Sequence, residues 1–121
     1  MAFQSNSILI VDDEKSILFS LKAALTKEGY TVRTSESPQD ALKLVEPGAF
    51  QVIISDFNMP EMTGVQLIER VRSLERIDPP KFIVMSAGKN ADIALRGGAD
   101  HFFSKLSPLE ELVTAITELT S

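Results

Sequence analysis

The feature that most constrains the fold is a regular alternation between short apolar segments and segments with helical periodicity. The short segments, rich in β-branched residues as strands are, cover residues 7–11, 30–35, 51–55, 81–86 and, more weakly, 101–104. The helical segments cover residues 15–28, 38–46, 64–75, 90–96 and a last helix from Pro108, with Ser107 and Glu110 as a capping box. Strands that alternate with helices through short loops form parallel sheets. We therefore expect residues 1–121 to form a single α/β domain, a five-stranded parallel sheet with helices on both faces.

Polar and charged side chains stand where the predicted strands end. Asp12 and Asp13 follow the first strand, Asp56 the third, Ser86 ends the fourth, and Lys105 follows the fifth. In open parallel sheets, ligands bind beyond the carboxyl ends of the strands, where the winding direction changes. Each residue alone also has a structural explanation, such as capping of the next helix by Asp12 or Asp13. Their occurrence at four strand ends predicts one shared site.

Clustered carboxylates in that site would repel one another. Two like charges about 4 Å apart repel by about 4 kcal/mol at an effective dielectric constant near 20. A whole domain is stable by only about 5–15 kcal/mol, so protonation, wide separation or a bound cation must relieve the repulsion. The chain has no cysteine and one histidine, which leaves oxygen ligands. Oxygen ligands favour Mg²⁺ or Mn²⁺ over zinc, and we expect such a hard-metal site.

The composition excludes several other kinds of function. Without cysteine, the chain cannot form disulfides, thiolate metal sites or a cysteine nucleophile. The single histidine, His101, stands at a predicted strand start and is interpreted as a surface residue. A net charge of −5 argues against non-specific binding of nucleic acid. We see no signal peptide and no apolar run long enough to span a bilayer, so we expect a cytoplasmic protein without a membrane partner.

Four segments of the chain match a known family. The segments are "ILIVDDE", "VIISDFNMPEMTG", "FIVMSA" and "GADHFFSK", and the pattern D-x-N-M-P-x-M-x-G at residues 56–64 is the most specific element. The chain resembles the receiver domain of two-component response regulators, which accepts a phosphoryl group from a histidine kinase on one aspartate. The resemblance covers almost the whole chain and implies a flavodoxin-like (βα)5 fold, doubly wound, with strand order 2-1-3-4-5. We see no output domain in this chain.

The resemblance also implies a role for each residue of the site. Asp56 is the phosphoacceptor, whose carboxylate attacks phosphorus to form an acyl phosphate. Asp13, Asp56 and the backbone carbonyl of Asn58 ligate Mg²⁺ (or Mn²⁺), and Asp12 acts through metal-bound water. Lys105 neutralises the charge of the arriving phosphoryl group and pairs with Asp56 when the site is empty. Such a site works by positioning and charge neutralisation, with little covalent chemistry by the protein.

A switch is the second implication of the resemblance. Ser86 hydrogen-bonds a phosphoryl oxygen once Asp56 is modified, and its loop moves toward the phosphoryl group. Phe102 occupies the switch-aromatic position of the family and can fill the vacated space; the alternative is a plain core phenylalanine. The event would change the surface formed by the fourth helix, the fifth strand and the fifth helix.

Two features depart from the family pattern. Leu106 stands where a proline, often in a cis bond, usually follows the conserved lysine. A cis bond before a non-proline residue costs about 2.5–4 kcal/mol, so we predict a trans Lys105–Leu106 bond and a rearranged loop. The segment from Ser86 to Lys105 is also about one helical turn shorter than usual. We therefore predict a short or irregular fourth helix that ends at Gly97-Gly98.

Several functional hypotheses remain open from the sequence. The expected partners of a receiver are a histidine kinase or phosphotransfer protein, an effector or output domain, and a second copy of the chain in a homodimer. A receiver of this kind is no enzyme beyond its own phosphorylation and dephosphorylation. The altered loop motivates an alternative, a phosphorylation-independent docking module. A Mg²⁺-dependent aspartyl phosphohydrolase would carry its nucleophile after the first strand, and a flavodoxin-like cofactor protein would need a phosphate-binding loop where "DDEKS" presents carboxylates.

Overall fold

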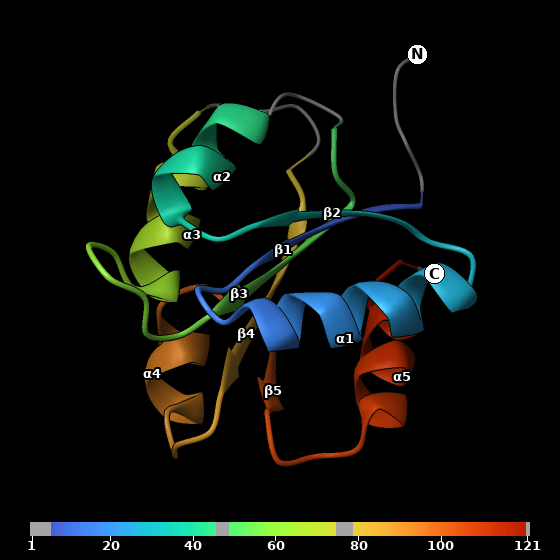
Figure 1. Ribbon diagram of the computed structural model, residues 1–121. Helices are drawn as coiled ribbons and strands as arrows, with labels where there is room; N and C mark the ends of the chain where they lie inside the picture. Colours follow the sequence, from blue (N-terminus) through green and yellow to red (C-terminus); the bar gives the residue numbers. More distant parts are fainter. Residues whose placement is uncertain (1–5, 46–48, 75–78, 121) are drawn as a thin grey trace.

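The computed structural model describes residues 6–45, 49–74 and 79–120, and it places a parallel sheet between two layers of helices (Figure 1). The strands are β1 (Ser7–Val11), β2 (Thr31–Ser35), β3 (Val52–Asp56), β4 (Lys81–Ser86) and β5 (His101–Ser104). All neighbouring strands pair in parallel, in the order β2-β1-β3-β4-β5, which confirms the predicted fold. The chain runs from β1 outward to β2 and then returns past β1 to β3. The winding direction therefore changes between β1 and β3. In open parallel sheets, ligands bind beside the carboxyl ends of the strands at such a point.

Helices cover both faces of the sheet. They are α1 (Lys15–Lys27), α2 (Pro38–Leu44), α3 (Gly64–Arg72), α4 (Ala91–Arg96) and α5 (Leu109–Thr120). One buried cluster joins the sheet to α1 and α5, and a second joins it to α2, α3 and α4 (Figure 1). None of the helices in the described ranges is long and apolar enough to cross a membrane.

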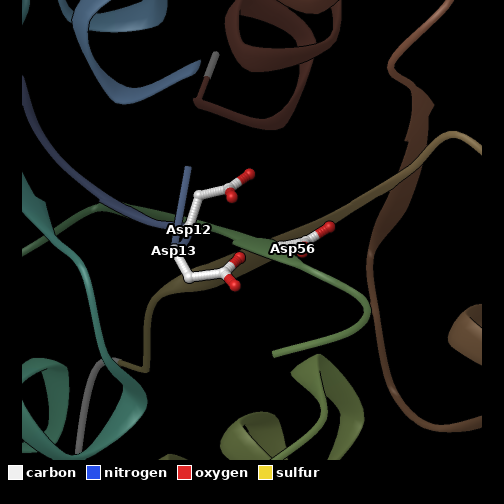
Figure 2. A group of neighbouring side chains, drawn as sticks. All are labelled: Asp12, Asp13 and Asp56. Atoms are coloured by element: carbon white, nitrogen blue, oxygen red, sulfur yellow. The ribbon is translucent and has the colours of Figure 1, made fainter. Parts of the chain in front are cut away.

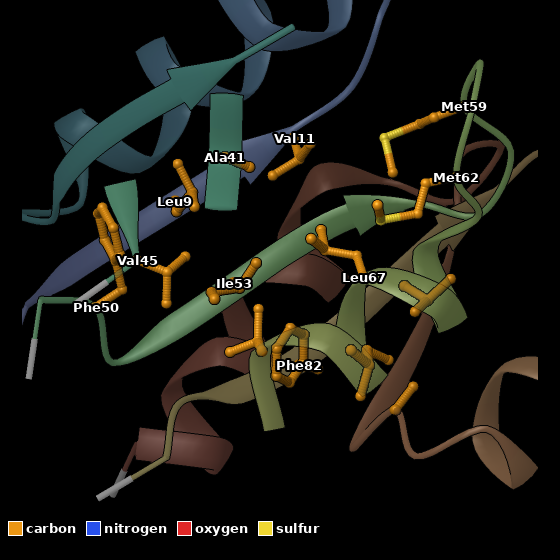
Figure 3. Packing of buried hydrophobic residues seen from close by; sticks show 14 of the residues in the cluster. Leu9, Val11, Ala41, Val45, Phe50, Ile53, Met59, Met62, Leu67 and Phe82 are labelled. Carbon is orange, nitrogen blue, oxygen red and sulfur yellow. The ribbon is translucent and has the colours of Figure 1, made fainter. Parts of the chain in front are cut away.

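The central strands are buried along their whole length because both of their faces are covered. Successive side chains of a strand point to opposite faces. In β1, Leu9 and Val11 join the cluster under α2 and α3, whereas Ile8 and Ile10 join the cluster under α1 and α5. Figure 3 shows the cluster under α2, α3 and α4, with Phe82 packed beside α3. This packing fixes the strands, and with them the positions at which their carboxyl ends deliver side chains.

Several predicted boundaries are wrong by a few residues. The observed elements begin or end at Lys27 instead of 28, Thr31 instead of 30, Leu44 instead of 46, Val52–Asp56 instead of 51–55, Arg72 instead of 75, Ala91 instead of 90 and Leu109 instead of Pro108; residues 46 and 75 lie outside the described ranges. The predicted capping box is also wrong, because no hydrogen bond joins Ser107 to Glu110 in the part of the chain that the structure describes. Asp56 is thus the last residue of β3 rather than a loop residue, so the sheet itself holds its backbone.

Helix α4 has six residues, as short as predicted. A Cβ at Gly97 would lie 2.6 Å from Cγ1 of Val65 in α3, so only glycine allows this approach. Gly98 has a φ of +109°, a conformation that side chains rarely adopt. The glycine pair therefore ends α4 and directs the chain into β5.

Candidate functional site

Three carboxylates meet at the carboxyl ends of β1 and β3. One oxygen from each of Asp12, Asp13 and Asp56 lies within 4.8 Å of the others. Figure 2 shows the three carboxylates projecting in a similar direction from the ends of β1 and β3. Asp12 is completely buried and Asp56 nearly so, whereas Asp13 is exposed. The predicted convergence of the acids at the switch point is therefore present in the structure.

Lys105 lies among these acids. Its Nζ is 2.9 Å from Oδ2 of Asp12, 3.0 Å from Oδ1 of Asp56 and 3.3 Å from Oε1 of Glu14. The Lys105–Leu106 bond is trans, as predicted, since the described residues include no cis peptide bond. The backbone N–H of Lys105 donates to the carbonyl of Ser86 at 2.9 Å. The lysine thus reaches the predicted site without a proline after it.

Burial and charge shift the pKa values of these groups. Burial raises the pKa of Asp12, and the hydrogen bond from the Glu14 amide and the contact with Lys105 only partly oppose it. Burial likewise raises the pKa of Asp56, against the opposing effect of Lys105. For Lys105, burial lowers the pKa, but contacts with Asp12 and Asp56 outweigh it and the pKa is raised. One ammonium thus offsets only part of the cost of burying two carboxylates.

Asp12 retains an oxygen that suits a cation. Its Oδ1 accepts from the backbone N–H of Glu14 at 2.9 Å. Its Oδ2 is buried, lies 2.9 Å from the Lys105 ammonium and has no other partner among the described residues. A buried carboxylate oxygen whose one partner is a lysine ammonium, beside two further carboxylates, belongs to the hard donor set that Mg²⁺ takes. The residues present fit such an ion.

Neither Asp12 nor Asp13 is the N-cap of α1. Glu14 occupies the cap position, and its side chain forms no capping hydrogen bond. The Asp12 carboxylate instead bonds the Glu14 amide, in the turn that leads into the helix. A role in the turn before α1 therefore explains one carboxylate oxygen of Asp12, and it explains neither carboxylate oxygen of Asp13.

The loop after β3 closes tightly against the end of that strand. The Phe57 amide donates to the carbonyl of Met85 at 2.7 Å, and the Gly64 amide donates to the carbonyl of Phe57 at 2.9 Å. A Cβ at Gly64 would lie 2.6 Å from the backbone oxygen of Asp56, so this return requires glycine. Asn58 lies exposed in the same loop, two residues after Asp56.

The two predicted switch residues lie on the neighbouring strands. Ser86, the last residue of β4, is buried, and its Oγ accepts from the Gly88 amide at 3.0 Å and from Nδ2 of Asn90 at 2.8 Å. Phe102 in β5 is half-buried and packs against the cluster under α2, α3 and α4. The structure thus groups Asp12, Asp13, Asp56 and Lys105, and it places Ser86 on the adjoining strand end.

Sequence reasoning missed two contacts of this site. Glu14 is a third carboxylate on Lys105, and the run of three acids in "VDDE" was a signal for it. Asn90 holds the hydroxyl of Ser86, and nothing in the sequence pattern pointed to it. The Glu14–Lys105 contact joins residues far apart in the sequence, and the Asn90–Ser86 bond depends on the path of the loop after β4. Local patterns define neither.

Comparisons with known proteins agree with this geometry. The family model described as "Response regulator receiver domain" matches residues 8–117. The transcriptional regulatory protein TcrA of Mycobacterium tuberculosis is 31% identical over 115 residues, which cover 93% of this chain and 45% of TcrA. The chain thus spans less than half of the length of this curated relative.

Solved structures of receivers are similar over the whole fold. A signal receiver domain from Bermanella marisrubri has a TM-score of 0.88 at 25% identity, with 98% of this chain and 100% of that chain covered. The chemotaxis protein CheY4 of Vibrio cholerae has a TM-score of 0.85 at 28% identity, with 93% and 97% covered. Because the family model spans nearly the whole chain and the fold and acid cluster agree with it, the chain belongs to the response regulator receiver domain family.

Proposed function

We propose that Asp56 accepts a phosphoryl group from a histidine kinase or a phosphotransfer protein in a Mg²⁺-dependent reaction. The observation that carries this proposal is the cluster of Asp12, Asp13 and Asp56, with the Lys105 ammonium in contact with Asp12 and Asp56. Asp56 lies at the topological switch point, where its carboxylate is held by the sheet and neighbours both a metal-binding donor set and a cation.

The proposed reaction is a displacement at phosphorus. An oxygen of the Asp56 carboxylate forms the new P–O bond while the P–N bond to the donor histidine breaks, and the leaving nitrogen takes the electron pair and a proton. Lys105 moves from Asp56 to the phosphoryl oxygens and neutralises part of their charge. Asp13, Asp56, the Asn58 carbonyl and, through water, Asp12 would hold Mg²⁺, which supplies further charge neutralisation when bound.

We further propose that phosphorylation changes the surface of α4, β5 and α5. An acyl phosphate adds charge and acceptor oxygens beside Ser86. The Ser86 hydroxyl donates to one of these oxygens, and Phe102 repacks into the space that the loop leaves. The changed surface binds an effector, an output domain or a second copy of the chain. Because the phosphoryl group would come from a histidine kinase or a phosphotransfer protein, we propose that the domain acts in the cytoplasm.

Intact mass spectrometry tests the phosphoacceptor directly. The chain is incubated with acetyl phosphate and Mg²⁺, and we expect a gain of one phosphoryl group that alkali removes. Asp56→Asn should abolish the gain. Asp40→Asn, which changes an exposed carboxylate in α2, should retain it. Absence of any gain from several acyl phosphates, with no Mg²⁺ affinity, would contradict the proposal and leave the docking module as the function.

The phosphohydrolase hypothesis places the nucleophile after β1. Asp12, its candidate, is completely buried, and one of its oxygens is bonded to the Glu14 amide. Asp56 at the end of β3 is the better-placed nucleophile, so the geometry favours a phosphoacceptor. Hydrolysis of small phosphoesters that is lost in Asp12→Asn would reverse this assignment.

A further inference from the structure

The hydroxyl of Ser86 is held entirely by the loop that follows β4. Its Oγ accepts from the Gly88 amide and from the side-chain amide of Asn90, so both acceptor positions of the oxygen are occupied. Ser86 is only 4% exposed. Its hydroxyl donates to no residue in the described ranges, which leaves a buried O–H group ready for a new acceptor.

Asn90 occupies the N-cap position of α4 but does not cap the helix. Asparagine is favoured at this position because its side-chain oxygen accepts from a free amide of the first turn. Here no side-chain capping bond is formed, and the side chain is directed to Ser86 instead. The backbone carbonyl of Asn90 accepts from the Ala94 amide at 3.0 Å, and Ala94 is completely buried. Asn90 therefore joins Ser86 to the first turn of α4.

The connection between β4 and α4 is short and closely packed. A Cβ at Gly88 would lie 3.3 Å from Nδ2 of Asn90 and 3.6 Å from Oγ of Ser86, so the loop is closely packed around this hydrogen bond. Helix α4 is six residues long, so its first turn is most of the helix. A displacement of Ser86 must therefore break the bond to Asn90 or move α4.

We propose that Asn90 is a positioning residue that couples the hydroxyl of Ser86 to helix α4. When Ser86 turns toward a new acceptor, Asn90 follows it and carries the first turn of α4. The inference deepens the proposed function, on which it rests for the identity of that acceptor, a phosphoryl oxygen on Asp56. The coupling itself is already present in the unmodified chain, where it can be measured separately.

The first experiment uses the unmodified chain and NMR spectroscopy. Ser86→Ala should shift the side-chain amide signal of Asn90 and the backbone amide signals of residues 91–96. Asn90→Ala should shift the same backbone signals, and the double variant should add little to either single change, because both remove one interaction. Lys89→Ala, at an exposed neighbour in the loop, is the matched control and should leave them unchanged. Additive effects, or an unchanged Asn90 side-chain signal in Ser86→Ala, would overturn the inference.

The second experiment adds acetyl phosphate and Mg²⁺ and follows intact mass and the same signals. The unsubstituted chain should gain one phosphoryl group and shift the signals of residues 91–96. Asn90→Ala should keep the mass gain and lose more than about half of the shift change, as expected when the coupling bond is removed. A full α4 response in Asn90→Ala would refute the inference.

A second variant and a folding control keep this experiment decisive. If the unsubstituted chain gains no mass, the proposed function fails while the first experiment still decides the role of Asn90. Asn90→Asp replaces the donor with acceptor oxygens of the same size. Its carboxylate should accept a hydrogen bond from the Ser86 hydroxyl and so weaken the α4 response. A full response would count against the coupling. Circular dichroism verifies that each variant is folded.

Discussion

Asp12→Asn should stabilise the metal-free protein, because burial of this carboxylate costs more than its ion pair returns. Asp12 is completely buried, and burial raises its pKa even though Lys105 lies 2.9 Å away. A raised pKa means that folding favours the neutral acid, and each pKa unit corresponds to about 1.4 kcal/mol in the free energy of unfolding. Asparagine keeps the shape of the side chain and removes the charge.

The expected magnitude follows from the charges around Asp12. Oxygens of Asp12 and Asp56 lie within 4.8 Å, and at an effective dielectric constant near 20 their repulsion is about 3.5 kcal/mol or more. On the same scale the attraction of Lys105 is about 6 kcal/mol, and exposed Asp13 adds a screened repulsion. The attraction exceeds the repulsion by at most about 2.5 kcal/mol on this scale. The desolvation cost of a buried carboxylate, several kcal/mol, therefore decides the sign. We expect a gain of about 1–2 kcal/mol, as is common when functional-site strain is removed.

Urea unfolding at neutral pH, followed by circular dichroism, measures this effect. In EDTA, Asp12→Asn should unfold at higher urea than the unsubstituted chain. Glu69→Gln, at an exposed carboxylate in α3, should change the stability by less than about 0.5 kcal/mol. With Mg²⁺ at about 100 times its Kd, the unsubstituted chain should gain about 2.7 kcal/mol and Asp12→Asn clearly less. A metal-free Asp12→Asn variant that is less stable than the unsubstituted chain would refute the reasoning, since the ion pair would then outweigh burial.

Three further predictions follow from other contacts. Gly64→Ala should destabilise the protein by about 1–3 kcal/mol, because its Cβ would lie 2.6 Å from the backbone oxygen of Asp56; an unchanged thermal midpoint would contradict this. Asp100→Ala should cost about 1–3 kcal/mol in urea unfolding, because Asp100 accepts the amide of buried Phe82 at 2.8 Å; an equal midpoint would show that the amide finds another partner. In EDTA, the raised pKa values of Asp12 and Asp56 mean that the native state binds more protons than the unfolded state between the unfolded and folded pKa values. Their contribution to the free energy of unfolding therefore falls as pH rises through that window. In Asp12→Asn this free energy should fall less steeply with pH; an equal or steeper fall would argue against the effect assigned to burial of Asp12.

The sequence predicted the sheet well because its strands are buried on both faces. A fully apolar run such as residues 8–11 can be placed in the interior without knowledge of its neighbours. The carboxyl ends of such strands then define an edge, so the meeting of Asp12, Asp13 and Asp56 follows from topology. The strand order itself came from the family resemblance, since alternation alone permits more than one winding.

Hydrogen bonds within the loops were beyond the reach of local patterns. The bond from Asn90 to Ser86 competes with capping of α4, and tertiary geometry decides between the two. The failed capping box has a similar cause. The Ser107 amide donates to the carbonyl of Ser104 at 3.0 Å, in a turn that follows β5 directly and places the helix start at Leu109. Such choices depend on how strands and helices meet, which residue spacing does not encode.

The position of Lys105 depends on the sheet more than on the residue that follows it. Ser104 pairs with Ser86 at the end of the β4–β5 ladder, and the Lys105 amide then donates to the Ser86 carbonyl. The backbone of Lys105 is thus fixed before the chain turns. In the turn, the amide of Leu106 donates to Oγ of Ser104 at 3.2 Å, a bond that proline could not form. Pairing of β4 with β5 thus positions Lys105 next to the carboxylates, and the trans turn held by Ser104 comes only after it. The proposed chemistry therefore requires the β4–β5 pairing and tolerates leucine at position 106.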